Sequence, residues 1–208
     1  MIITVGAGDR FGYCPQLLGR QIVKYLLLSL SLLLSACVTT IADQNNALKQ
    51  KKLCCSDISN ISYQPLNSTK VATFELNEKG APVFDFGHGK TYFGALAIPA
   101  ELQQSNIQIK SYFNGMFIGQ YMQPYLLFLD SQFNAIEQGT MDMTFYDGSF
   151  NGDSNAHMLG GKRTPQHTAY IIVYTQAPYK KGGFVTVSGG TSIQLENAPT
   201  GKIELTFY

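Results

Sequence analysis

Two adjacent cysteines, Cys54 and Cys55, are the residues whose type and spacing most directly imply chemistry in this chain. Across a trans peptide bond their Cα atoms would lie about 3.8 Å apart, which is shorter than most disulfides prefer. Two interpretations stay open: a vicinal disulfide that caps a short helix, or a bridge to a second molecule. Metal binding by this pair is not favoured, because no further ligands follow at a suitable spacing.

The stretch DGSFNGDSNAHM, which begins at Asp147, carries part of a calcium-binding pattern. Asp147, Asn151 and Asp153 match the first half of a calcium loop, in which carboxylate and amide oxygens bind the ion. The last position of such a loop needs a bidentate carboxylate, and this chain has Met158 there. The pattern therefore indicates a hydrophilic turn, and we expect no metal in it.

Neither a zinc centre nor a hydrolytic site is indicated. The histidines are His88, His157 and His167, and none has a second His or Cys at a zinc-binding spacing. The chain has no G-x-S-x-G elbow. A glycosidase would need two carboxylates across a sugar ring; Asp130, Asp142 and Asp147 are candidates, but acidic residues at strand ends are common and the sequence does not show that any pair faces a shared cleft. We therefore expect a protein without enzymatic activity and without a cofactor.

An aromatic-rich segment carries the candidate sugar-binding side chains. Tyr112, Tyr121 and Tyr125 stand in it together with amide residues such as Asn114 and Gln120. Aromatic rings can stack on the faces of sugars while amides bind the hydroxyl groups, so this segment is a candidate carbohydrate-binding surface. The same residue types are also ordinary core and rim residues of β-sheets, and the chain has no Trp. Both interpretations stay open.

Short strands are the elements that must position these residues. Runs rich in β-branched and aromatic residues, separated by Gly, Pro, Asn and Asp, predict strands at 70–76, 91–98, 106–113, 125–130, 169–175, 184–187 and 202–208. In the last strand Ile203, Leu205 and Phe207 alternate with polar residues, which predicts one buried face. The uninterrupted apolar runs 125–129 and 170–174 predict central strands that are covered on both faces.

These strands predict an all-β fold, namely a single β-sandwich domain of jelly-roll or immunoglobulin-like type over residues 53–208. We expect a short helix before the strands, near Ala47–Ile58, which ends where Asp57 and Ser59 break it. The polar, glycine-rich stretch 147–166 predicts a long loop.

A leader precedes this domain. Lys24 stands before an apolar run from Tyr25 to Leu34, and small residues follow up to Cys37. This order is typical of a secretory signal peptide, and the run is far shorter than the ~20 residues that span a bilayer. The alternative is a buried apolar helix that ends at an ordinary cysteine, but the run lacks helical periodicity. We predict a leader over 1–36, with the signal peptide at 23–36.

The last four residues of this segment, Leu34-Ser35-Ala36-Cys37, resemble a bacterial lipobox. The resemblance implies cleavage before Cys37 and fatty acylation, as with palmitate, of its sulfur and its new amino terminus. Two or more fatty chains make a stable membrane anchor, whereas one chain holds a protein only marginally. Because Val38 follows instead of aspartate, sorting to the outer membrane is implied. We predict a lipid-anchored protein on the periplasmic face of the outer membrane, with a soluble periplasmic protein as the alternative.

Two boundaries follow from this prediction. Residues 1–22 do not have the composition of a signal-peptide n-region, and a GTG start codon would read as Val23 within the frame. Residues 1–22 are therefore predicted to be untranslated, and residues 37–52 to form the lipidated amino terminus and a polar tether.

The charge of the remaining chain excludes one class of partner. Three of the 15 Lys and Arg residues and one of the 14 Asp and Glu residues precede Cys37, which leaves a net charge of −1. No block of like charges stands out. We therefore expect no nucleic-acid partner.

Several blocks, in their order and spacing, resemble one family. They are LCCSDISNISYQPL (53–66), YFGALAIPA (92–100), PYLLFLDSQFNAI (124–136), AYIIVYT (169–175) and PTGKIELTFY (199–208). Together they resemble the maltose operon periplasmic protein family over roughly residues 53–208, and the lipobox is a departure from the family's namesake. The resemblance implies a β-rich binding or accessory protein of carbohydrate uptake in the bacterial envelope, without a catalytic motif.

The predicted function follows from the resemblance and the anchor. We expect a non-enzymatic accessory or binding role in transport of maltose or maltodextrin-type carbohydrate. The expected partners are the bilayer through acylated Cys37, maltodextrin or another glycan, and envelope transport proteins. The alternative is a structural or scaffolding envelope protein that binds another protein through its edge strands or its long loop.

Overall fold

The computed structural model describes residues 40–114, 119–148, 155–176, 181–186 and 190–208, with the backbone alone at 181 and 182. All described residues lie in the second of two units of the chain, Thr39–Tyr208. Among the described residues, no helix has the length and the apolar character that crossing a bilayer requires.

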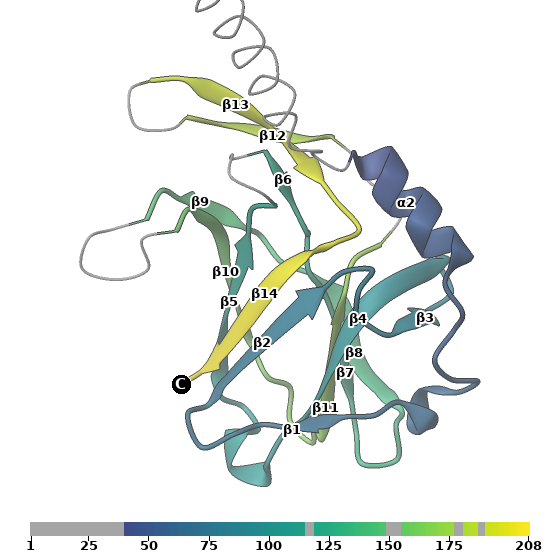
Figure 1. Cartoon of the computed structure of the whole chain (residues 1–208). Helices are drawn as coiled ribbons and strands as arrows, with labels where there is room; N and C mark the ends of the chain where they lie inside the picture. The colour runs from purple at the N-terminus through teal and green to yellow at the C-terminus, as the bar shows by residue number, and fades with distance from the viewer. Residues whose placement is uncertain (1–39, 115–118, 149–154, 177–180, 187–189) are drawn as a thin grey trace, which may run out of the picture. The chain divides into compact units, whose positions relative to one another are not determined.

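The second unit has an all-β fold with one short α-helix (Figure 1). A six-stranded sheet has the order β1-β4-β11-β7-β8, with β3 paired to β4 beside this path, and a five-stranded sheet has the order β2-β14-β5-β10-β9. A smaller sheet has the order β12-β13-β6.

The bounds of the elements are as follows. The six-stranded sheet contains β1 (Gln64–Pro65), β3 (Val83–Asp85), β4 (Lys90–Ala97), β7 (Tyr125–Leu129), β8 (Ala135–Thr140) and β11 (Tyr170–Tyr174). The five-stranded sheet contains β2 (Val71–Leu76), β5 (Asn106–Tyr112), β9 (Thr144–Tyr146), β10 (His157–Arg163) and β14 (Gly201–Phe207). The small sheet contains β6 (Gln120–Tyr121), β12 (Lys181–Thr186) and β13 (Ser192–Asn197), and the helices are α2 (Ile41–Gln50), η1 (Ile58–Asn60) and η2 (Ala100–Leu102).

Alternation along the strands builds a core shared by the two larger sheets. Ile203, Leu205 and Phe207 of β14 are buried, as their alternation with polar residues predicted. They join one apolar cluster with side chains of the six-stranded sheet, among them Phe128 and Val173. Burial of this apolar surface is the main force that holds the two sheets together.

The central strands of the six-stranded sheet are covered on both faces, and this prediction is confirmed. In β7, Leu126 and Phe128 belong to the shared core, whereas Leu127 and Leu129 belong to a second cluster on the opposite face. Rings from the connecting segments cover that second cluster, for example Phe86, which stacks on Tyr174 of β11 with centroids 4.3 Å apart. A strand buried on both faces needs no alternation, which explains its uniformly apolar sequence.

Helix α2 lies earlier in the chain than the sequence predicted. It spans Ile41–Gln50, within the expected tether, and the predicted helix near Ala47–Ile58 is wrong. The cause is a capping box: Thr40 Oγ1 accepts from the backbone N–H of Asp43, and the Asp43 carboxylate accepts from the Thr40 N–H. Asp57 instead caps the short η1, so the helical signal near the cysteines belongs to a separate turn.

The predicted long loop over 147–166 is also wrong in its second half. Residues 157–163 form β10, which pairs with both β5 and β9. His157 and Met158 are buried there, and a side chain at Gly160 would collide with Met143, so glycine allows close packing at this point. High glycine content in this strand reflects a close approach of neighbouring groups and not a loop.

Candidate functional site

Four side chains form a row across the outer face of the five-stranded sheet. In the strand register Tyr146 of β9 pairs with His157 of β10, and His157 pairs with Tyr112 of β5. Lys202 of β14 continues the row, with its Nζ 5.0 Å from the centroid of the Tyr112 ring. We call these four residues the Tyr112 row. Ser111, next to Tyr112, is buried in the interior, so the alternation of the strand directs Tyr112 outward.

Ring contacts connect the members of the Tyr112 row. The ring centroids of Tyr146 and His157 are 5.0 Å apart, and those of His157 and Tyr112 are 5.5 Å apart. The ammonium of Lys202 over the Tyr112 ring makes a cation–π contact. Tyr146 is 38% exposed while His157 is 2% exposed, so a buried imidazole separates two phenol rings of the sheet surface.

A hydrogen bond fixes the ring of His157. Its Nδ1 lies 2.8 Å from the backbone oxygen of Asn155. Because a carbonyl oxygen only accepts hydrogen bonds, Nδ1 carries the proton and donates it, which leaves Nε2 as an acceptor in the neutral ring. This hydrogen bond fixes the orientation of the His157 ring, which lies between the rings of Tyr112 and Tyr146.

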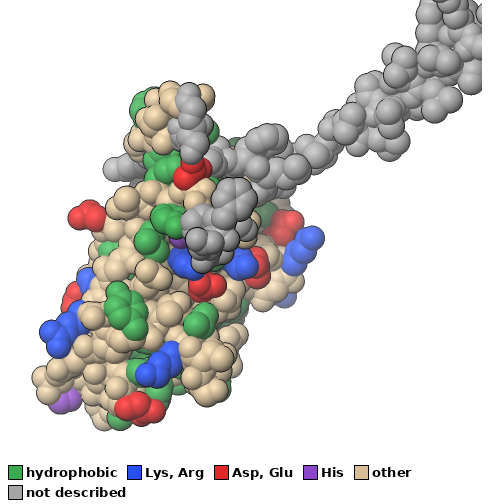
Figure 2. All heavy atoms as spheres, turned by 90° about the vertical axis from the view of Figure 1, so that its left-hand side faces the viewer, with side chains coloured by type: hydrophobic (Ala, Val, Ile, Leu, Met, Phe, Trp, Pro, Cys, Tyr) green, Lys and Arg blue, Asp and Glu red, His purple; other side chains and the backbone are tan. Residues whose placement is uncertain are grey.

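Charged groups lie beside the Tyr112 row on the same face. Lys110 and Glu204 form an ion pair with N and O atoms 3.3 Å apart, and Glu75 pairs with Lys202 in the strand register. Figure 2 looks onto this side of the molecule, where apolar, charged and other polar side chains are mixed on the surface. The face thus combines aromatic rings with groups that donate and accept hydrogen bonds.

The structure does not bring the three predicted sugar-binding tyrosines together. Tyr121 of β6 is 7% exposed, its hydroxyl donates to Gln123 Oε1 at 2.7 Å, and burial raises its pKa. Tyr125 of β7 packs against Tyr174 with ring centroids 5.1 Å apart, in the second apolar cluster. Of the three, Tyr112 alone lies in the Tyr112 row.

Cys54 and Cys55 are joined by a disulfide within one molecule, with Cα atoms 3.8 Å apart. The pair lies between α2 and η1 and caps neither helix, because the caps on its two sides are Lys51 and Asp57. The Cys54 N–H donates to the backbone oxygen of Val83 at 2.8 Å, and Cys55 packs on the second cluster. The bridge thus holds the segment that covers the outer face of the six-stranded sheet. The predicted lipid attachment site, Cys37, lies outside the described residues.

No metal-binding group occurs among the described residues: nowhere do three or more His, Cys, Asp or Glu side chains gather in a way that could hold an ion. His88 and His167 are exposed and lie in turns apart from His157. In the calcium-like stretch, Asp147 is described, whereas residues 149–154 lie outside the described part.

Comparison of the chain with models of protein families, with curated proteins and with solved structures finds no match to any of them. The resemblance to the maltose operon periplasmic protein family therefore stays a prediction.

Sequence reasoning missed two members of the Tyr112 row. His157 lies within the predicted loop 147–166 and Tyr146 directly precedes it, and neither was part of a predicted strand, so no strand alternation was assigned to them. Alternation alone would have placed Lys202 on the outer face of β14, opposite Ile203. What joins these residues is the register between β9, β10 and β5, which depends on pairing between distant segments.

Proposed function

We propose that this chain is an exported bacterial lipoprotein with a non-enzymatic accessory or binding role in carbohydrate uptake, with maltodextrins as the ligand class. Acylated Cys37 anchors it to the periplasmic face of the outer membrane. The lipobox-like tetrapeptide before Val38 and the charged, apolar and small regions of the leader support the anchor. Labelled palmitate is expected on the wild-type protein and not on a Cys37→Ser variant, and label on the variant would contradict the anchor.

We further propose that the all-β unit is a β-sandwich of jelly-roll or immunoglobulin-like type. Its support is the apolar cluster to which both larger sheets contribute side chains, for example Phe74 and Leu205 from one sheet and Leu96 and Phe128 from the other. Aligned packing of two sheets over one core is the defining feature of this architecture.

The Tyr112 row is the observation that carries the carbohydrate-binding proposal. Pyranose rings have apolar C–H faces that stack on aromatic rings, and Tyr146 and Tyr112 offer such rings on a sheet surface. Lys110, Glu204 and Lys202 supply charged hydrogen-bonding groups within the same face. Linear glycans suit this arrangement because successive sugar units could contact Tyr146 and Tyr112, which lie on either side of the buried His157.

Isothermal titration of the exported protein with maltoheptaose, in a detergent without a sugar headgroup, tests the proposal. We expect Tyr112→Ala to weaken binding about five- to tenfold, because one stacking contact is worth about 1 kcal/mol. Tyr208→Ala is the matched control, since Tyr208 is 67% exposed and lies outside the row. Equal affinity of Tyr112→Ala and the wild type would contradict the proposal.

A protein-binding scaffold in the envelope is the second candidate, and one residue favours it. Phe184 of β12 is 70% exposed, so its ring is available for contact with a partner. Crosslinking in intact cells is expected to recover a specific protein with the wild type and much less of it with Phe184→Ser. Equal recovery with both would remove Phe184 as support for this candidate.

A further inference from the structure

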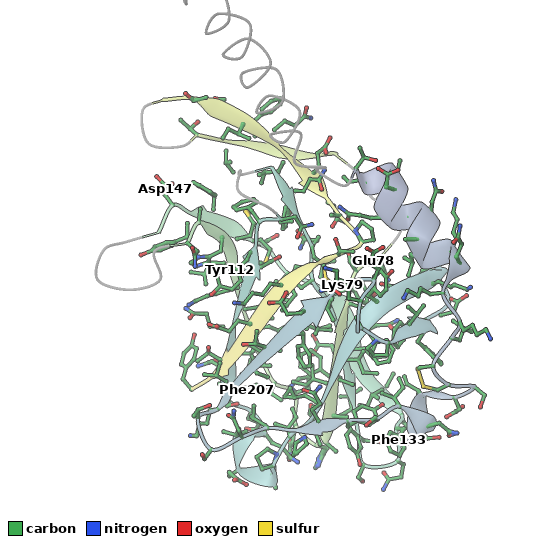
Figure 3. All side chains as sticks on the ribbon, viewed as in Figure 1. Glu78, Lys79, Tyr112, Phe133, Asp147 and Phe207 are labelled. Atoms are coloured by element: carbon green, nitrogen blue, oxygen red, sulfur yellow. A yellow bond between two sulfur atoms is a disulfide. The ribbon has the colours of Figure 1, made fainter. Side chains whose placement is uncertain are left out.

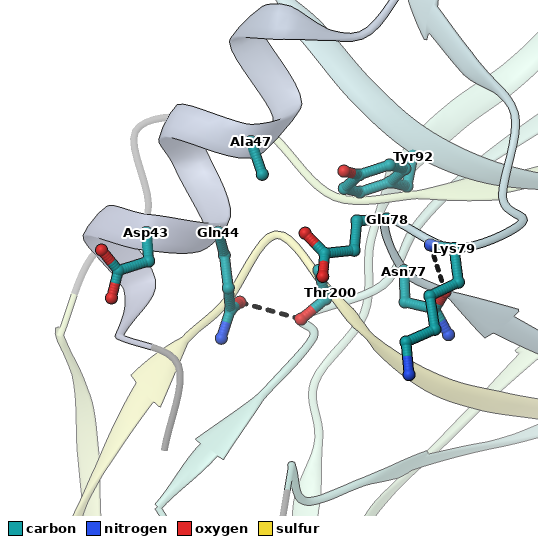
Figure 4. Close-up of a pocket in the computed structure, with 8 residues that line it drawn as sticks. All are labelled: Asp43, Gln44, Ala47, Asn77, Glu78, Lys79, Tyr92 and Thr200. Atoms are coloured by element: carbon teal, nitrogen blue, oxygen red, sulfur yellow. Dashed lines mark hydrogen bonds between the residues drawn. The ribbon is translucent and has the colours of Figure 1, made fainter. Parts of the chain in front are cut away.

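A pocket of about 300 Å³ lies between α2, the turn that follows β2, and the residues that lead into β14 (Figure 4). We call it the α2 pocket. Its polar lining includes Gln44 of the helix, Asn77 and Glu78 of the turn, Tyr92 of β4 and Thr200. This volume is at the lower end of the range for ligand sites, which suits one or two sugar rings.

Hydrogen bonds hold α2 in place as a wall of the pocket. Gln44 Oε1 accepts from Thr200 Oγ1 at 2.8 Å, and Gln44 Nε2 donates to Gln120 Oε1 at 3.2 Å. At the other end of the helix, the Lys90 ammonium donates to the backbone oxygens of Lys49 and Lys51 at 3.0 and 2.6 Å. The wall that α2 forms is therefore in place before any ligand enters, which lowers the entropic cost of binding, and neighbouring side chains have to move to open Tyr92 Oη to the ligand.

One hydroxyl group in the pocket lacks a partner. Tyr92 is completely buried, and among the described residues no group forms a hydrogen bond with its Oη. Figure 4 shows the Tyr92 ring beside the Glu78 carboxylate, with its oxygen directed toward α2. Burial raises the pKa of Tyr92 and the negative charge of Glu78 raises it further, so the phenol stays protonated. A buried donor without a hydrogen-bond partner lowers the stability of the folded protein. A ligand that accepts a hydrogen bond from it removes that cost, and this gain contributes to binding.

We infer that the α2 pocket binds a small uncharged polyhydroxyl ligand, and that one of its hydroxyls joins Tyr92 to Glu78. A hydroxyl group accepts and donates at once, so it can accept from Tyr92 Oη and donate to the Glu78 carboxylate, which only accepts. Asn77 Oδ1 already accepts from the Lys79 N–H at 2.9 Å, which leaves the Asn77 amide nitrogen to donate to a second hydroxyl. The lining carries two carboxylates, Asp43 and Glu78, and one ammonium, Lys79, so it disfavours an anion, while a neutral polyhydroxyl ligand can form hydrogen bonds with all three groups.

This site is separate from the Tyr112 row and does not rest on the proposed function. The two share no residue, and the α2 pocket is lined by α2 and the turn that follows β2, neither of which contributes to the row. A method that reports binding at individual residues therefore tests the α2 pocket and the Tyr112 row independently.

Nuclear magnetic resonance titration of the full exported protein with maltose tests the inference. We expect saturable shifts of the side-chain amides of Gln44 and Asn77. In Tyr92→Phe, which removes the hydroxyl alone, the apparent Kd should rise about three- to tenfold, the loss expected for one hydrogen bond. Glu78→Gln should weaken binding as well. Tyr92→Phe should unfold at the same temperature as the wild type or higher, because it removes an unpaired buried hydroxyl.

Tyr121→Phe is the matched control. It also removes a buried hydroxyl, but this one donates to Gln123, so the variant should lose stability while the shifts of Gln44 and Asn77 stay those of the wild type. Absence of shifts at both amides at 50 mM maltose, or equal affinity of Tyr92→Phe and wild type, would overturn the inference. Shifts at Gln44 and Asn77 without shifts at Tyr112 and Lys202 would support the inference and count against sugar binding at the Tyr112 row. Shifts at Tyr112 and Lys202 without shifts at Gln44 and Asn77 would overturn the inference and leave the Tyr112 row as the binding site.

Discussion

The Tyr112 row and the α2 pocket represent two ways in which a β-sheet protein can present polar and aromatic groups. The row is a set of neighbours across one sheet, ordered by strand register and open to solvent at Tyr146. The pocket is a hollow assembled from a helix, a turn and two strand ends, with a buried and unpaired hydroxyl in it. Figure 3 shows Tyr112 on one side of the molecule and Glu78 and Lys79 close to α2.

The difference lies in what keeps each region in shape. The rings of the row stand on strands whose other faces carry apolar side chains, those of β5 and β14 in the shared core and those of β9 and β10 in a separate small cluster, so the sheet itself positions them. The pocket depends in addition on the docking of α2, which rests on one buried apolar side chain, Leu48, and on the bonds of Gln44 and Lys90. Changes that loosen the helix should therefore damage the pocket and leave the row intact.

Leu48→Ala should have the largest effect and should separate the two regions. Leu48 is 3% exposed and lies in the shared core, so truncation should lower the free energy of unfolding by about 2–4 kcal/mol. The shifts of Gln44 and Asn77 with maltose should disappear, while maltoheptaose binding at Tyr112 persists. Urea unfolding measures the first effect, with exposed Asn46→Ala on the same helix as the control. Parallel loss of both binding signals in a folded variant would contradict the separation.

Gly94→Ala should weaken the support that both regions share. A methyl group at Gly94 of β4 would overlap the ring of Phe74 of β2, so the core between the two sheets must give way. We expect a loss of about 1–3 kcal/mol in the free energy of unfolding. Gly139→Ala is the control, because nothing lies within 4 Å of a side chain added at Gly139. A loss no greater than that of the control would show that Phe74 moves aside without cost.

Thr40→Ala should lower the free energy of unfolding by about 1 kcal/mol, because Thr40 caps α2. The change should disturb the α2 pocket and leave the Tyr112 row intact. Thermal unfolding of this variant beside Thr69→Ala, an exposed threonine in a turn, measures the contribution of the cap. An unchanged melting temperature for Thr40→Ala would mean that α2 is held by Leu48 and Gln44 without its cap.

The same cap gives a pH dependence with a definite sign. Hydrogen bonds from Thr40 hold the pKa of Asp43 below its usual value of 3.8. A carboxyl whose pKa is lower in the folded state stabilises that state above the unfolded pKa, and this contribution is lost as pH falls through the folded pKa. We expect the stability difference between Thr40→Ala and the wild type to shrink as pH falls below 3.8, because the bond from Thr40 Oγ1 to the Asp43 carboxylate weakens on protonation, while the bond from the Asp43 N–H to Thr40 Oγ1 persists. An equal difference at pH 2.5 and pH 6 would contradict this assignment.

Glu204→Gln should have the smallest effect, and on the row side alone. Its ion pair with Lys110 is partly exposed, so its removal should cost about 0.5 kcal/mol or less at low salt. The difference should shrink in 1 M NaCl because salt screens surface charges. Glu137→Gln, which removes the pair with Lys162 elsewhere in the fold, is the control. A loss above 1.5 kcal/mol would show that Glu204 has a larger structural role.

Strands with a clear pattern could be predicted from the sequence, and elements set by tertiary contacts could not. The alternation of β14 and the apolar runs of β7 and β11 predict which of their residues are buried. The glycines of β10 gave a false prediction of a loop. Gly160 is needed because a side chain there would collide with Met143, and this requirement is not visible in the sequence. The start of α2 does carry a local signal, the capping pair Thr40 and Asp43, although the helix has no apolar periodicity that would predict it.

The two candidate regions differ in the same way. Tyr112 could be selected from the sequence because it lies in an aromatic segment, but its neighbours in the row come from other strands through register. Nothing local marks the α2 pocket: Gln44, Tyr92 and Thr200 are far apart in the chain and meet only after the helix docks. Its unpaired hydroxyl is visible only once the burial and the neighbours of Tyr92 are known.

A crystal structure of the exported protein grown with maltoheptaose tests the central claim, carbohydrate binding on the Tyr112 row, most directly. We expect glucose units stacked on the rings of Tyr112 and Tyr146, with hydroxyls bound to Lys202 or Glu204. Sugar that is bound only in the α2 pocket, or absent from both regions at millimolar maltoheptaose, would contradict the claim.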